Sequence, residues 1–201
     1  MILSKHYLPL IYSIFVLSIL VSCSKVITNR EYTEGMKLEL KNMYNDDQQA
    51  QKYDLKKVVR KEYSDSMETE FNILCDKHIF TVKKYFVEYG FPGIKENGNE
   101  TALNFWLIVQ HGDNHLDFQQ NVLKAMKKQL TLKNVSSRNY AYLYDRVKKN
   151  QNKPQLYGTQ MVWDSKGSHF LYKIKSPKRV NERRKKMGLE PLEDYKNNFN
   201  D

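Results

Sequence analysis

The sequence predicts a mainly α-helical fold, a single-domain bundle of about five or six helices with one β-hairpin near residues 156–174. Apolar side chains recur at helical spacing over most of the chain between residues 32 and 149. The period then changes to alternation in two short runs within residues 156–174. A chain of 201 residues that loses a short leader is long enough for one packed core and short for two.

Residues 1–22 have the pattern of a secretory leader that ends at a lipidation site. Lys5 supplies positive charge, and an apolar run over residues 7–21 leads to the small residue Ser22. The tetrad Leu20-Val21-Ser22-Cys23 resembles the bacterial lipobox, in which the cysteine thiol receives a lipid before the leader is removed. We therefore predict a lipoprotein in which Cys23 carries a lipid such as palmitate.

An uncleaved membrane span is the alternative, because no charged residue lies between Lys5 and Lys25. A spanning helix needs about 20 mostly apolar residues, and Pro9, Ser13 and Ser18 interrupt a run that is already short. We therefore expect three parts: a signal peptide at 1–22, a tether at 23–30 and one mainly helical domain at 31–201. The tether reaches roughly 25 Å when extended, so the domain would lie close to a membrane of the cell envelope, outside the cytoplasm.

Two helices are expected in the first half of the domain. The first falls within residues 32–61, where Met36, Leu40 and Met43 lie at helical spacing. The second covers residues 68–89. Its inward positions are Phe71, Leu74, Cys75, His78, Val82 and Phe86. The second cysteine of the chain is therefore expected to be a buried packing residue.

Three more helices are expected before the hairpin. Asn99 or Thr101 is a candidate cap for a helix through residues 102–109. This segment is apolar nearly all round, so it should be the central, buried helix. The next two helices are expected at residues 116–130 and 138–149.

The hairpin and one last helix complete the expected fold. Apolar and other side chains alternate along residues 157–163 and again along residues 170–174. A turn that ends in a glycine lies between the two runs, which is typical of a hairpin. The last helix should run over residues 176–187. Gly188 and Pro191 are expected to cap and stop it.

The chain is basic, with 33 lysines and arginines against 23 acidic residues and a net charge of +10. Such a charge favours anionic lipid headgroups, envelope polymers or nucleic acid, and a location outside the cytoplasm argues against nucleic acid. One dense basic cluster comprises Lys178, Arg179, Arg183, Arg184, Lys185 and Lys186. We interpret the cluster as the solvated face of the last helix, with docking onto anionic lipid or polymer as the alternative.

An ordered series of short motifs resembles a widespread bacterial family of unknown function. The series consists of Asp47-Gln48, Trp106-Leu107-Ile108-Val109-Gln110-His111, Asp113, Phe118-Gln119, Tyr142-Leu143-Tyr144-Asp145-Arg146-Val147, Gln155-Leu156-Tyr157-Gly158-Thr159-Gln160 and Arg183-Arg184-Lys185-Lys186-Met187-Gly188-Leu189-Glu190-Pro191-Leu192. The resemblance covers most of the domain and implies no established activity. The chain departs from it at His115-Leu116, where the family tends to have Asp-Pro, and at Gln51, where it tends to have an arginine.

The candidate polar site comprises His111, Asp113, Asp145, Arg146, Tyr157, Thr159 and Gln160. In one hypothesis His111 is a base or ligand that Asp113 orients, while Arg146 and Tyr157 stabilise an anionic group. The spacing matches no zinc motif, so no metal or other cofactor is expected. In the structural alternative Asp113 caps the following helix, and Asp145 or Arg146 forms a buried pair with His111 or its neighbour.

The sequence therefore favours a binding or structural module of the cell envelope. Its polar strip would hold a small polar ligand, an envelope polymer or a partner protein. A hydrolase-like or metal-assisted enzyme centred on His111 and Asp113 is the alternative. No Ser-His-Asp order, phosphate-binding loop or paired-glutamate pattern indicates a particular enzyme class.

Overall fold

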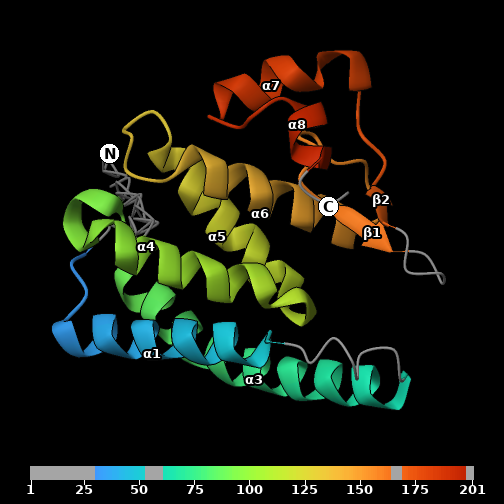
Figure 1. Cartoon of the computed structure of the whole chain (residues 1–201). Coiled ribbons are helices and arrows are strands. Elements are labelled where there is room, and N and C mark those ends of the chain that lie inside the picture. Colours follow the sequence, from blue (N-terminus) through green and yellow to red (C-terminus); the bar gives the residue numbers. More distant parts are fainter. Residues whose placement is uncertain (1–29, 53–60, 164–168, 198–201) are drawn as a thin grey trace, which may run out of the picture.

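The computed structural model of the chain describes residues 30–52, 61–163 and 169–197 (Figure 1). The predicted lipid attachment site, Cys23, and the leader before it lie outside the described residues. Helices make up most of the described chain, and a small antiparallel hairpin accompanies them. The predicted fold class is therefore confirmed. Within the described ranges no helix is long and apolar enough to cross a membrane.

The described residues form seven α-helices, two 3-10 turns and two strands. The α-helices are α1 (Glu34–Ala50), α3 (Lys61–Tyr89), α4 (Ile94–His111), α5 (Leu116–Gln129), α6 (Ser137–Asn150), α7 (Val180–Lys186) and α8 (Leu192–Asn197). The 3-10 turns are Asp113–His115 and Pro177–Arg179. The strands are β1 (Met161–Trp163) and β2 (His169–Leu171), paired with Val162 opposite Phe170.

Several helix predictions differ from the structure. Helix α3 begins at Lys61 instead of residue 68, and the last helix, expected from residue 176, begins with a 3-10 turn before α7. Helix α4 begins at Ile94 and is interrupted at Gly98, whose φ of 79° and ψ of 164° are not helical. The start expected near Asn99 is therefore the point where the helix resumes after this break. Helix α8 was not predicted, because Pro191 was interpreted as a stop signal. A proline is equally well placed directly before a helix, where no N–H group is needed, and the carbonyl of Pro191 accepts the N–H of Tyr195 at 3.1 Å.

Helix α4 lies at the centre of the fold, as predicted. It contacts α1 and α3 on one side and α5 and α6 on the other, and Figure 1 shows it between these two layers. The ring of Phe105 on α4 is fully buried, with its centroid 5.7 to 6.3 Å from those of Tyr32, Phe86 and Phe91. Burial of this aromatic cluster joins the N-terminal helices to α4.

The part of the chain after α6, about a quarter of its length, packs onto α6 through two smaller apolar clusters. At their junction lies Arg184 of α7, which is fully buried. Its guanidinium donates to the carbonyl groups of Tyr157, Gly158 and Glu190 at 2.9, 3.1 and 2.6 Å. The interpretation of the basic cluster as a solvated face is therefore wrong for Arg184, because carbonyl groups satisfy its Nε and Nη1 atoms in the interior and its Nη2 atom lies 3.8 Å from the carboxylate of Glu190.

Gly158 allows α7 and α8 to approach this loop closely. Its φ is +71°, and a Cβ at this position would lie 2.9 Å from the Cδ1 atom of Leu192. Gly188 has a similar φ of +68°, but a Cβ there would meet nothing within 4 Å. The two glycines thus share a backbone requirement and differ in the space around them.

We expect Gly188→Ala to lower the free energy of unfolding by about 1 kcal/mol, the backbone cost of a left-handed residue. Gly158→Ala should lose about 1 to 3 kcal/mol more, because it adds a steric clash with α8. Urea unfolding of both variants measures the difference. Equal losses would show that the contact with Leu192 relaxes at no cost.

Candidate functional site

The structure divides the predicted site residues into two groups at different places. His111, Asp113 and Arg146 lie near the C-terminal ends of α4 and α6 and are partly exposed. Asp145, Tyr157, Thr159 and Gln160 are buried around the loop of residues 155–160. The sequence motifs therefore do not converge on one site.

The buried group is a network that fixes the loop after α6. The carboxylate of Asp145, with no exposed surface, accepts hydrogen bonds from the backbone N–H groups of Leu156, Tyr157 and Thr159 at 2.7, 3.1 and 3.1 Å. It also accepts the Thr159 hydroxyl at 3.1 Å. Burial raises the pKa of Asp145, and these hydrogen bonds oppose that rise. The carboxylate faces donors of its own chain, so its role is structural.

Tyr157 and Gln160 belong to the same buried network. The ring of Tyr157 packs edge-on against Tyr144, with centroids 5.7 Å apart. The backbone N–H of Gln160 donates to the side-chain oxygen of Gln155, and its amide donates to the Thr159 hydroxyl. Both residues therefore stabilise the loop and do not extend the exposed group.

His111 is oriented by Asp47, a residue of α1 that was not among the predicted site residues. The Nδ1 atom of His111 lies 2.6 Å from the Oδ2 atom of Asp47, whose side chain is 3% exposed. An ionised carboxylate can only accept, so Nδ1 carries the proton and Nε2 is left as an acceptor in the neutral ring. That Nε2 atom forms no hydrogen bond with any described residue.

Gln51 completes the support of this pair. Its Nε2 atom donates to the Oδ1 atom of Asp47 at 2.7 Å. The same nitrogen lies 3.5 Å from Nδ1 of His111, a contact between two donors that contributes no hydrogen bond. Gln51 therefore fixes the carboxylate, which in turn fixes the imidazole.

Asp113 neither orients His111 nor caps α5 but binds Arg146. Its carboxylate accepts Nε and Nη2 of the guanidinium at 2.8 Å each, in a two-point arrangement. The amides of Asn150 and Gln119 donate to its Oδ1 atom at 2.8 and 3.4 Å. Burial alone would raise the pKa of Asp113, but the hydrogen bonds and charge of Arg146 outweigh it and lower the pKa.

Three glutamine side chains leave buried acceptors near these charged pairs. The Oε1 atoms of Gln110, Gln119 and Gln151 are buried and have no donor among the described residues. The orientation of Gln119 is fixed, because its amide nitrogen donates to the carbonyl groups of Val109 and Gln110. Buried acceptors without donors cost free energy, and the burial of these oxygens keeps them from direct contact with a molecule in solvent.

The charges of Asp47, Asp113 and Arg146 act on the thiol of Cys75, which lies on α3. It is buried, as predicted, and burial raises the pKa of its thiol to about 12. A neutral thiol is a poor nucleophile, so Cys75 is a packing residue. Among the described residues, no group of three or more His, Cys, Asp or Glu side chains converges as a metal site.

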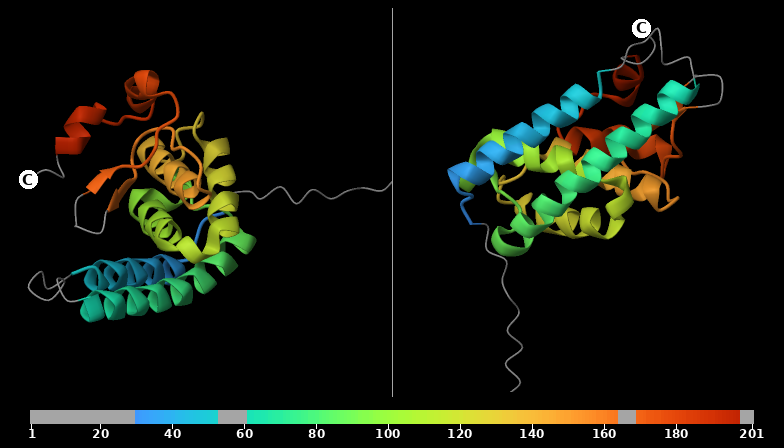
Figure 2. Two further views of the ribbon diagram at one scale, coloured as in Figure 1. Left: turned by 90° about the vertical axis from the view of Figure 1, so that its right-hand side faces the viewer. Right: turned by 90° about the horizontal axis from the view of Figure 1, so that it is seen from below.

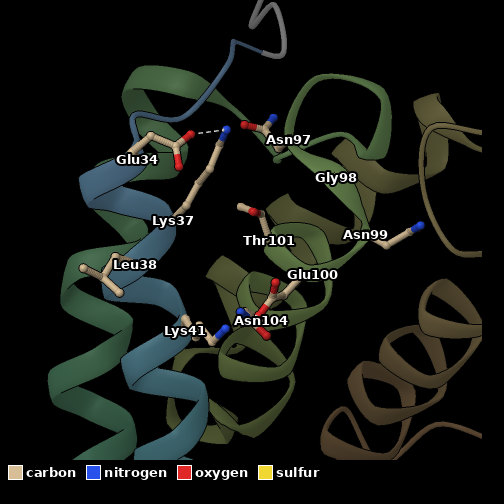
Figure 3. Close-up of a pocket in the computed structure, with 10 residues that line it drawn as sticks. All are labelled: Glu34, Lys37, Leu38, Lys41, Asn97, Gly98, Asn99, Glu100, Thr101 and Asn104. Atoms are coloured by element: carbon tan, nitrogen blue, oxygen red, sulfur yellow. Dashed lines mark hydrogen bonds and ion pairs between the residues drawn. The ribbon is translucent and has the colours of Figure 1, made fainter.

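A separate pocket of about 420 Å³ lies between the first half of α1 and the break in α4 (Figure 3). Lys37 pairs with Glu34 at 2.9 Å and Lys41 with Glu100 at 3.1 Å along its rim. Asn104, 4% exposed, lies against its wall. None of the predicted site residues lines this pocket.

Comparison with known proteins identifies the family but no activity. A family model described as a family of unknown function (DUF6624) matches residues 35–201, so the chain belongs to this family. No curated protein matches the chain. No solved structure matches it either.

We expect Asp145→Ala to lower the free energy of unfolding by at least about 3 kcal/mol, because three backbone N–H groups lose a buried acceptor. Hydrogen exchange should accelerate most in residues 155–160. Asp117→Ala is the control, since the side chain of Asp117 is exposed on α5. Equal effects of the two variants would contradict the structural role of Asp145.

Acid should remove the contribution of Asp113 to stability. Its folded pKa is lowered, so the stabilisation is fully present above the ordinary value of 3.8 and is lost as the pH falls through the folded pKa. Urea unfolding should therefore separate the parent from Asp113→Asn at neutral pH and bring them together in acid. In an Arg146→Gln background most of this pH dependence should disappear.

Proposed function

We propose that this family member is a membrane-tethered lipoprotein of the bacterial cell envelope whose helical domain binds a small polar ligand at the exposed group of His111, Asp113 and Arg146. One observation carries the binding proposal. Asp47 fixes the His111 ring so that its Nε2 acceptor is unpaired among the described residues.

The contacts of the site define the chemistry of the ligand. The Nε2 atom of His111 is an acceptor in the neutral ring, so it requires an N–H or O–H group of the ligand. Arg146 binds Asp113 through Nε and Nη2, which leaves Nη1 for an anionic group. The side chains of Asp113 and Arg146 are 38% and 24% exposed, so a ligand can approach them from solvent. A small molecule with both hydrogen-bond donors and an anionic group fits these contacts.

The lipoprotein part of the proposal rests on the sequence. Cys23 follows an N-terminal apolar run and the residues Leu20-Val21-Ser22, and a lipid on its thiol would attach the domain to a membrane. The described domain begins at Arg30, seven residues later. The domain would therefore encounter its ligand within a tether length of the bilayer.

A general-base hydrolase is the second candidate, and the Asp47–His111 pair favours it. A neutral imidazole held through Nδ1 by a buried carboxylate can accept a proton from water at Nε2. No described hydroxyl or thiol contacts this Nε2 atom, so the nucleophile would be water itself. Two variants separate the candidates. If the site is catalytic, Asp47→Asn and His111→Ala should each lower the rate of hydrolysis by about 100-fold or more while the affinity for the ligand is retained. If the site only binds the ligand, the same variants should lower the affinity itself.

We expect a thermal-shift screen of amino acids and sugar phosphates to yield compounds that stabilise the parent chain. Their affinity should fall at least about tenfold in His111→Ala and in Arg146→Gln, because each variant removes a charge-assisted or directed hydrogen bond. His115→Ala is the matched control, since His115 is also paired with a carboxylate, that of Asp76, at 2.9 Å.

Two results would contradict the proposed site. Compounds that bind the His111 variant as tightly as the parent do not use this group of residues. Compounds that lose affinity only in Asn104→Ala bind instead in the pocket between α1 and α4, because Asn104 lines that pocket.

A further inference from the structure

We propose that the outer face of α3 docks onto the surface of an anionic membrane, an inference that rests on the lipidation of Cys23 proposed above. The face, called the α3 stripe, consists of Ile73, Lys77, Phe80, Lys84 and Val87. The lipid would hold the chain to the membrane, and the stripe would set the orientation of the domain on it.

The five residues of the α3 stripe lie on one side of the helix. Their spacing of four and three residues confines them to an arc of about 80° at 100° per residue. The buried positions of α3 lie on the opposite side; they are Cys75, His78, Ile79, Val82 and Phe86. The stripe therefore faces away from the core along the whole middle of the helix.

The apolar members of the stripe are large and unusually exposed. Ile73, Phe80 and Val87 are 65%, 64% and 69% exposed. Single exposed apolar residues are ordinary on a protein surface, but these three are aligned on one face along about 21 Å of helix. Such a face gains free energy when a bilayer surface covers it.

Lysines occupy the remaining positions of the stripe. The Nζ atom of Lys84 lies 4.2 Å from the centroid of the Phe80 ring, so charge and apolar surface are contiguous. Long lysine side chains can leave their methylene groups on the apolar surface and extend their ammonium groups to phosphate headgroups. Glu70, Asp76 and Glu88 border the stripe; the carboxylate of Asp76 is occupied by His115 at 2.9 Å, and that of Glu70 accepts the Ser66 hydroxyl at 3.2 Å.

The α3 stripe lies near the point where the chain enters the domain, and therefore near the lipid proposed on Cys23. The backbone N–H of Arg30 donates to the carbonyl of Tyr89 at 3.1 Å, two residues beyond Val87. The residues from Cys23 to Arg30 span at most roughly 25 Å. Figure 2 shows α3 along the outer edge of the molecule with the start of α1 beside its C-terminal end. A lipid at Cys23 therefore keeps the stripe within reach of the bilayer.

A second copy of the chain fits the stripe less well than a membrane does. The seven-residue spacing of Ile73, Phe80 and Val87 also suits a helix partner. In such a pair, however, Lys77 and Lys84 of both copies would lie in one contact, where like charges repel. Anionic headgroups instead complement these lysines.

Phe80→Trp in the lipidated full chain tests the proposal, because residue 80 is exposed and the substitution leaves the core unchanged. The chain is reconstituted in vesicles of phosphatidylethanolamine and phosphatidylglycerol whose acyl chains carry bromine, a quencher of tryptophan fluorescence. The matched control is Phe170→Trp on β2, where the side chain is 53% exposed. The parent chain supplies the signal of the native tryptophans for subtraction.

We expect quenching and a blue shift at position 80 and neither at position 170. In addition, Ile73→Ser, Phe80→Ser and Val87→Ser combined should lower the vesicle partition coefficient of a chain of residues 24–201, which carries neither leader nor lipid, at least about tenfold. Equal quenching at the two positions overturns docking through the stripe. A blue shift at position 80 that grows with protein concentration and needs no vesicles overturns it in favour of a second copy.

Incorporation of labelled palmitate is measured in parallel and separates the two proposals. Palmitate on Cys23 without quenching at position 80 overturns the docking and leaves the lipoprotein proposal standing. Absence of palmitate overturns the lipoprotein proposal and the docking that rests on it.

Discussion

The attachment of the C-terminal quarter, which follows α6, depends on the burial of one carboxylate. Asp145 of α6 satisfies three backbone N–H groups in the loop of residues 155–160. The loop in turn offers carbonyl groups to Arg184 of α7 and to the hydroxyl of Tyr195 of α8. A buried anion, a loop and a buried cation thus form one chain of hydrogen bonds, which adds direction to the small apolar clusters that pack α7 and α8.

The sequence predicts the parts of the fold that follow from local periodicity. Helix α5 and the hairpin were expected close to where they occur, because their apolar patterns and turn residues are local signals. Arg184 could not be located in this way. It lies in a basic run, and its burial depends on carbonyl groups 26 and 27 residues earlier. Pro191 was misread because a proline that ends one helix can also begin another.

The candidate site illustrates the same limit. His111 and Asp113 are adjacent in sequence motifs, which suggested a pair, yet the partner of His111 is Asp47, 64 residues away. Neighbouring positions on a helix diverge, so Asp145 faces the buried loop while Arg146 faces Asp113. The motifs therefore combine residues that stabilise the fold with residues that are available to a ligand, and only tertiary contacts separate the two.

The entry of the chain into the domain has a mechanical consequence. Tyr32 donates two hydrogen bonds, from its backbone N–H to the side-chain oxygen of Asn97 at 2.7 Å and from its hydroxyl to the carbonyl of Gly90 at 2.8 Å. The backbone hydrogen bond from Arg30 to Tyr89 lies next to them. Any pull on residues before Arg30 is thus transmitted to the turn between α3 and α4. Force would load several hydrogen bonds and an aromatic cluster together before it reached the first turn of α1, so the domain can resist tension without unravelling from its N-terminal helix.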